Sequence, residues 1–211
     1  MHSSIWILLI STASIAFLHA LAPDHWMPFS VIAKAQNWSR PKLFWVTLIS
    51  GIGHVGISFV VSAIAILLGF SISKLKNIEG HRGEIALWLL VGFGIAYMLW
   101  GIKKAKKKNQ AENFKKADIV AIWTIFAIFV LGPCESLVPL VFLGYSSAGW
   151  MGVLSVSLIF SLITIMMMLV QTFLAFKGIQ LIKNDILHRY SHAFAGLVIA
   201  LTGILVLLLG I

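Results

Sequence analysis

The sequence has little charge, few acidic residues and a single cysteine. Charged residues make up 11% of its 211 positions, and Asp and Glu together number only 7. With 60% hydrophobic residues and a mean hydropathy of +0.98, the composition excludes a soluble domain, because a chain of this size cannot hide so much apolar surface from water. The lone Cys134 excludes an intramolecular disulfide and a relay of two thiols within one chain.

Long apolar stretches take the place of the missing polar residues. A membrane-spanning helix needs about 20 apolar residues, and six stretches approach or reach that length: 4–26, 43–71, 84–102, 118–144, 149–176 and 191–210. The ten-residue alternation of a membrane barrel is missing, so these segments must satisfy their backbone groups as helices. The sequence therefore predicts an all-α protein with six transmembrane helices and the lipid bilayer as its surroundings.

The net charge of +9 is carried by the connections between these stretches. The first, third and fifth connections hold thirteen of the sixteen Lys and Arg, the second holds three and the fourth holds none. Cytoplasmic connections are rich in Lys and Arg, so a multi-pass protein of the plasma membrane with both termini outside is predicted. Residues 103–117 are interpreted as a basic cytoplasmic loop, with lipid headgroups as an alternative partner. The run KKAKKK lacks interleaved aromatic residues, which argues against nucleic acid.

Two halves of three helices, 1–102 and 118–211, each begin with a helix that carries prolines around an acid. The residues are Pro23, Asp24 and Pro28 in the first half, and Pro133, Glu135 and Pro139 in the second. Proline removes a helical hydrogen bond and frees the carbonyl four residues earlier. The first and fourth helices are therefore expected to be interrupted, with free carbonyls at Asp24 and Glu135. Three helices per half invert the second half, and paired interrupted helices in inverted repeats point to a transporter's binding site.

The second helix of each half carries a polar stripe. Residues spaced three or four apart share one face of a helix. The first stripe consists of Thr47, Ser50, His54, Ser58 and Ser62, and the second consists of Ser157, Ser161, Thr164, Met168 and Gln171. Both faces are expected to contact protein or a wet pathway, with packing of small residues as the alternative. His54 lies among three glycines without a sequence-local partner, which favours a functional role. His188 and His192 are expected to be solvated.

Five side chains inside the predicted membrane region can ligate a cation: His19, Asp24, His25, His54 and Glu135. A carboxylate in this setting is costly and by default a candidate for function. Imidazole suits nickel, cobalt, zinc and copper, whereas a set of oxygen ligands suits magnesium or calcium. Cys134 and Met168 are possible additional ligands that would favour softer metals, and packing is the alternative role of both. The same cluster can also relay protons, because metals displace protons from their ligands.

Three motifs resemble the nickel/cobalt transporter family. HALAPDH fits the family's H-x4-D-H signature through His19, Asp24 and His25, and GIGHVGIS resembles its next-helix Gly-His motif through Gly53 and His54. LGPCES takes the place of a later acidic motif and matches it in part, at Leu131, Gly132 and Glu135. The chain is most similar to the short six-helix branch that includes urease-accessory membrane proteins. The resemblance implies transport of a divalent transition metal, nickel or cobalt first, with zinc or copper as alternatives.

The GPC…P pattern is also similar to the membrane thiol carriers of cytochrome c biogenesis. That likeness implies shared traits of fold, whereas their chemistry needs a second cysteine where this chain has Asp24. We therefore expect a metal transporter rather than an enzyme, with protons as a possible coupling ion. Two alternatives stay open: a membrane protein that passes electrons or delivers metal to a maturing enzyme, and a proton-coupled exporter of a small solute. An anion would require Arg or Lys, and the predicted helices contain none.

Overall fold

The computed structural model describes residues 2–106, 113–132, 134–182 and 189–210, which form helices and short connections without strands. In chain order the elements are α1 (His2–Ala20), the 3-10 helix η1 (Pro23–His25), α2 (Met27–Ala35), α3 (Arg40–Leu67), α4 (Ile72–Lys106), α5 (Asn113–Leu131), α6 (Leu137–Leu181) and α8 (Ser191–Leu209). The predicted all-α class is therefore confirmed for the described residues.

Four helices in the described part of the chain are long and apolar enough to cross a membrane, namely α3, α4, α6 and α8. Shorter apolar helices cover Ile5–Ala20 and Ile119–Leu131. Large apolar side chains are spread over the outside of the bundle, among them Trp6 and Trp123, which are 63% and 65% exposed. Such a surface suits lipid and not water. The chain is a multi-pass membrane protein.

The helix boundaries differ from the predicted spans in two places. α4 begins at Ile72 instead of near residue 84, and it includes Glu79 and Arg82, which were expected in a polar connection. These two residues form an i,i+3 ion pair, so the helix continues through them. α6 covers the end of one predicted span and the whole of the next, and it passes through a kink at Ala148 and Gly149. Gly149 has φ of 57°, which glycine adopts without strain.

The described prolines begin new helices instead of lying inside old ones. Pro23 opens η1, while Pro28 and Pro139 lie in the first turns of α2 and α6. Proline is tolerated there because first-turn N–H groups have no intrahelical acceptor. The carbonyls of Asp24 and Glu135 therefore precede helix starts, which corrects the prediction that interior prolines free them. Pro133 lies outside the described residues, as does part of the basic connection 103–117.

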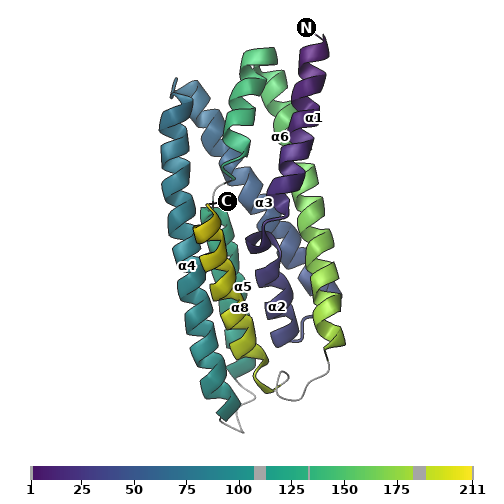
Figure 1. Cartoon of the computed structure of the whole chain (residues 1–211), viewed down its shortest axis with the longest axis vertical. Helices are drawn as coiled ribbons and strands as arrows, with labels where there is room; N and C mark the ends of the chain where they lie inside the picture. Colours follow the sequence, from purple (N-terminus) through teal and green to yellow (C-terminus); the bar gives the residue numbers. More distant parts are fainter. Residues whose placement is uncertain (1, 107–112, 133, 183–188, 211) are drawn as a thin grey trace.

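The helices pack in two groups around α3 (Figure 1). α4 lies along α8, α1 lies along α6, and α3 contacts both α5 and α6. At the α4–α8 contact the backbones approach closely through glycine: a Cβ atom added to Gly94 would lie 2.8 Å from the carbonyl oxygen of Gly196. Small residues allow such close contact between membrane helices. α4 and α8 are therefore packed at backbone distance.

A buried hydrogen-bonded chain joins α4 and α8 to the end of α2. The Gln36 amide donates to the Tyr97 hydroxyl at 2.9 Å, which lies 2.8 Å from His192 Nδ1, and His192 Nε2 lies 2.7 Å from Lys104 Nζ. A protonated lysine can only donate, so His192 accepts at Nε2 and donates from Nδ1 to Tyr97. His192 was expected to be solvated, but it is only 8% exposed because its partners come from distant helices. His188 lies outside the described residues.

Gly94→Ala should lower the stability of the protein by about 1–3 kcal/mol, the usual cost of overpacking. The new methyl group would meet backbone atoms of Ala200 and Gly196, which cannot move aside as a side chain can. Gly92→Ala is the matched control, since an added Cβ there meets nothing within 4 Å. Thermal unfolding in detergent compares the two variants. Equal midpoints would show that α4 and α8 do not pack at backbone distance.

Candidate metal centre

Three separate parts of the chain supply the candidate centre. His19 lies one residue before the end of α1, and Asp24 and His25 lie in η1. His54 lies in the middle of α3, and Cys134 lies in the break between α5 and α6. The break after α1 is stabilised from α6, where the Gln171 amide donates to the Ala20 carbonyl at 2.9 Å. The structure thus brings together residues that are far apart in the sequence.

His54 is held in one tautomer by the backbone of α5. Its Nδ1 lies 3.2 Å from the carbonyl oxygen of Phe129, and a carbonyl can only accept, so Nδ1 carries the proton. In the neutral ring Nε2 then has a free lone pair, and this atom is buried without a hydrogen-bond partner. A histidine whose second nitrogen donates to a carbonyl is the usual arrangement of a metal ligand. The five polar residues of the α3 stripe are all buried, which confirms the predicted protein-facing side.

His25 is held in the same way by Asp24. Its Nδ1 donates to Asp24 Oδ1 at 3.0 Å, and its Nε2 points to His19 Nε2, also at 3.0 Å. The His25 side chain is 5% exposed, whereas that of Asp24 is 23% exposed. The carboxylate therefore orients the imidazole from the wetter side and compensates positive charge in the cluster. This carboxylate–histidine pair is common around protein-bound metals.

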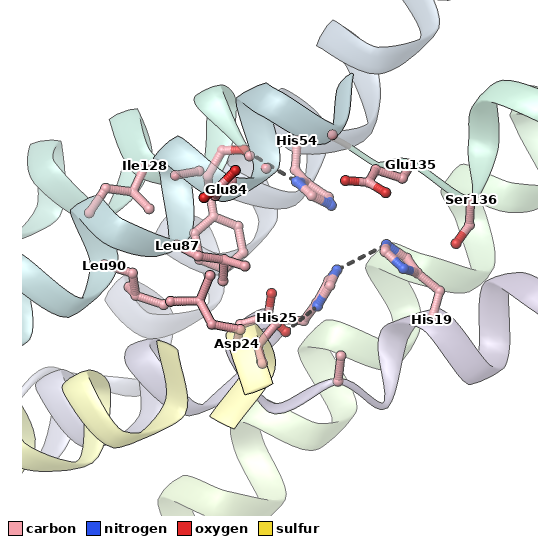
Figure 2. A pocket seen from close by; sticks show the side chains of 18 of the residues that line it. His19, Asp24, His25, His54, Glu84, Leu87, Leu90, Ile128, Glu135 and Ser136 are labelled. Carbon is pink, nitrogen blue, oxygen red and sulfur yellow. Dashed lines mark hydrogen bonds and ion pairs between the residues drawn. The ribbon is translucent and has the colours of Figure 1, made fainter. Parts of the chain in front are cut away.

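His19 links the other histidines to the Cys134 thiol. Its Nε2 is 3.1 Å from Cys134 Sγ, and its ring centroid is 4.4 Å from that of His25 and 6.1 Å from that of His54. Figure 2 shows the three rings of His19, His25 and His54 gathered on one side of a pocket. One ligand atom each from His19, His54 and Cys134 lies within 4.8 Å of the other two. Since His25 Nε2 accepts, His19 Nε2 donates in their hydrogen bond, and it can join the converging atoms as a ligand when a metal displaces that proton.

The position of Cys134 depends on α3. Its backbone N–H, which the break leaves without a helical acceptor, donates to Ser58 Oγ at 2.8 Å, and its carbonyl accepts from Leu137 N–H at 2.9 Å. Ser58 lies one helical turn after His54 on the same face. The same side of α3 therefore positions both the His54 imidazole and the backbone of the cysteine.

A cavity of ≈ 400 Å³ connects the histidines to the surface. Its wall is formed by η1, α3, α4, the α5–α6 break and the last residues of α8, including Val206 and Gly210. Glu84 and Glu135 line it and are exposed, so it is open to the outside of the bundle. Glu135, expected as a ligand or proton acceptor, lies on this wall near Gly80, with its carboxylate toward the cavity (Figure 2).

Two further buried residues have partners outside the predicted cluster. Met168, expected as a possible ligand, is fully buried in an apolar cluster and packs against Gly51, so the packing alternative describes its surroundings. Glu79, which the sequence did not single out, is fully buried in α4 beside Arg82, whose guanidinium also donates to the carbonyl of Val130. This pair joins α4 to the end of α5. The i,i+3 spacing of opposite charges was the available signal.

Ser58→Ala should cost about 1–3 kcal/mol of stability, because the buried N–H of Cys134 would lose its acceptor. Ser155→Ala is the control: that exposed hydroxyl bonds only to Met151 of its own helix, at 2.8 Å, and its loss should leave stability unchanged. Thermal unfolding in detergent again provides the measurement. A midpoint for Ser58→Ala equal to that of the control would contradict the assigned role of Ser58.

Comparison of the chain with protein-family models, curated proteins and solved structures finds no match in any of the three.

Proposed function

We propose that this protein transports a divalent transition-metal cation across a membrane through the His19–His25–His54 cluster. The observation that carries the proposal is the shared arrangement of His25 and His54. Each ring donates from Nδ1 to a fixed acceptor and directs Nε2 into the cluster. Histidines that merely pack have no need for converging lone pairs, whereas metal ligands require them.

Nickel or cobalt is the proposed cargo, with zinc or copper as alternatives. Imidazole nitrogen favours these ions over magnesium and calcium. The H-x4-D-H spacing of His19, Asp24 and His25 adds the resemblance to nickel/cobalt transporters. The described cavity lining contains neither Lys nor Arg, so it offers no positive group for an anionic solute. The single thiol, with imidazole as its neighbour, likewise disfavours a relay of two thiols.

Transport is preferred over a purely structural metal site because the cluster lies at helix breaks beside a cavity. In the proposed arrangement α1, η1 and α2 form the interrupted first span, and α3 and α4 complete the first half. α5 with the start of α6 forms the interrupted fourth span, the rest of α6 after the kink forms the fifth, and α8 forms the sixth. Ion sites of inverted-repeat transporters are built from such interruptions. The Lys and Arg distribution supports termini outside the plasma membrane.

In each state of such a transporter, the cation must reach the histidine cluster from one side of the membrane only. The histidines line the cavity together with Phe129, which contacts His25, His54 and the fully buried Phe29. The Phe29 and Phe129 ring centroids are 4.7 Å apart. A hydrated cation cannot pass such packed rings, since interiors of this density have no room for water. The aromatic pair therefore blocks the second side until helices move.

Wild-type protein should bind Ni²⁺, Co²⁺ or Zn²⁺ with low-micromolar or better affinity, and His54→Ala should weaken binding at least about 100-fold, the upper end of the cost of losing an outer-shell partner of a metal ligand. His81→Ala is the control, because this exposed imidazole bonds only to the Asn77 carbonyl of its own helix. Calorimetry measures affinity, and uptake of Ni²⁺ into proteoliposomes measures transport. The proposal is wrong if none of these metals binds to folded wild-type protein.

Glu135→Gln should slow metal uptake several-fold while leaving the calorimetric affinity nearly unchanged. The carboxylate lies on the cavity wall, where negative charge raises the local concentration of cations. Because salt screens exposed charges, the difference should shrink at high ionic strength. Glu84→Gln provides a parallel variant on the opposite wall element, α4. Loss of metal binding in Glu135→Gln would instead make Glu135 a ligand.

A further inference from the structure

We infer that Cys134 is a direct ligand of the transported cation, so that the centre is a four-coordinate site of three imidazoles and one thiolate. The inference rests on the proposed function and names the chemistry of its site. It differs from the packing role that a lone cysteine in an apolar helix usually has. Four observations on the described residues support it: distance, the state of a facing ligand, backbone placement and charge.

The first observation is distance. Metal bonds of about 2.0–2.1 Å to nitrogen and 2.3 Å to sulfur place tetrahedral ligand atoms roughly 3.3–3.6 Å apart. Cys134 Sγ lies 3.1 Å from His19 Nε2, and His19 Nε2 lies 3.0 Å from His25 Nε2. These separations are already close to the edges of a coordination tetrahedron. His54 lies within 4.8 Å of both His19 and Cys134, and His25 lies next to this group through its contact with His19, so rotations of the His25 and His54 side chains would complete the set.

The second observation is the state of His54. Its ring is 5% exposed, its Nδ1 is occupied by the Phe129 carbonyl, and its Nε2 is buried without a partner. A buried polar atom without a hydrogen bond costs about 1–3 kcal/mol. That cost is removed if Nε2 and Cys134 Sγ share one cation. The thiol therefore lies near an imidazole whose Nε2 lone pair is free to bind a cation.

The third observation is the placement of the cysteine backbone. Cys134 is fully buried and lies outside any helix, with its N–H bound to Ser58 and its carbonyl bound to Leu137 N–H. These two bonds fix the direction of the side chain. The sulfur is directed at an imidazole nitrogen instead of being surrounded only by the apolar residues of its packing cluster. Two fixed bonds at a helix break are what a ligand position requires.

The fourth observation is charge. A divalent cation is poorly tolerated in a buried site unless negative groups compensate it. Asp24 supplies one negative charge through its bond to His25. The remaining candidates are the Cys134 thiolate, in direct contact with His19, and Glu135, which is exposed on the cavity wall. The buried Glu79 carboxylate is already paired with Arg82. When the metal–sulfur bond forms, the thiol proton is released to water by way of the cavity that the neighbouring His19 lines, and the bound ion with Asp24 and the thiolate is neutral overall.

A thiolate among imidazoles narrows the class of cargo. Sulfur and nitrogen ligands in four-coordinate geometry select zinc, cobalt, nickel or copper and reject magnesium, calcium and manganese. Among divalent ions Zn²⁺ should bind more tightly than Co²⁺. Zn²⁺ should therefore displace bound Co²⁺, whereas a large excess of Mg²⁺ or Ca²⁺ should not.

The test is Co²⁺ titration of purified full-length protein in detergent, followed by visible and near-ultraviolet absorption. Wild-type protein should develop the intense visible bands of four-coordinate cobalt together with a near-ultraviolet thiolate-to-cobalt charge-transfer band. Because the chain has 1 cysteine, that band can arise only from Cys134. In Cys134→Ser the charge-transfer band should vanish while weaker Co²⁺ binding persists. Cys134→Ser keeps the size of the side chain, and gel filtration checks that it is folded.

X-ray absorption of the zinc-loaded wild-type protein gives the same answer without any variant. It should reveal one sulfur neighbour at about 2.3 Å beside nitrogen neighbours. Stoichiometric metal binding with nitrogen and oxygen neighbours alone, and no charge-transfer band, would overturn thiolate ligation but leave the proposed transport function intact. Failure of wild-type protein to bind any of these metals would overturn both.

Discussion

The whole centre depends on how the backbone is satisfied where helices stop inside an apolar bundle. Lipid offers no hydrogen bonds, so each N–H or carbonyl released at a break needs a partner from the protein. Long helices supply these partners: Gln171 of α6 bonds to Ala20, and Ser58 of α3 bonds to Cys134. His54 bonds to the carbonyl of Phe129 near the end of α5. The polar groups that stabilise the breaks also position the cluster.

Because the same polar groups stabilise the breaks and position the cluster, the polar residues of α3 are concentrated on one face. A single face carries the proposed ligand His54 and also Ser58, which positions Cys134, so one rotation of the helix would displace both. The opposite side of α3 carries exposed apolar residues such as Ile49 and Ile52, which favour lipid and oppose that rotation. Hydrophobic exposure and hydrogen bonding therefore select the same orientation, and the ligand geometry follows from it.

Sequence reasoning was most effective where a polar residue interrupts an apolar segment. His19, Asp24, His25 and His54 were identified on that basis, because such residues are costly in hydrocarbon without a role, and the structure brings these four together. The buried stripe of α3 was likewise predicted, since helical periodicity alone determines which residues share a face. The helix breaks were placed correctly in the sequence, but the prolines act at helix starts and not in helix interiors.

Features that depend on a distant partner were missed. Glu79 was expected in a connection because the spans were predicted from apolar length, which takes no account of its ion pair with Arg82. His192 was expected in water because Tyr97 and Lys104, its partners, lie on another helix. The direction of Cys134 could not be predicted either, since it depends on a bond to Ser58 across 76 positions of the chain. The contacts of His192 and Cys134 are tertiary and no local pattern records them, whereas the i,i+3 spacing of Glu79 and Arg82 was a local signal.

The separation between His19 and Cys134 has a consequence for biogenesis. These residues are in contact across 115 positions, so the N-terminal half leaves the ribosome and enters the bilayer well before the thiol is synthesised. Until then His19, His25 and His54 form only part of the centre, and a cation held by them alone lacks the ligand from the second half. In the proposed centre all ligands come together only after both halves have been inserted and docked, so a bound metal would favour the correctly assembled chain over partly inserted ones.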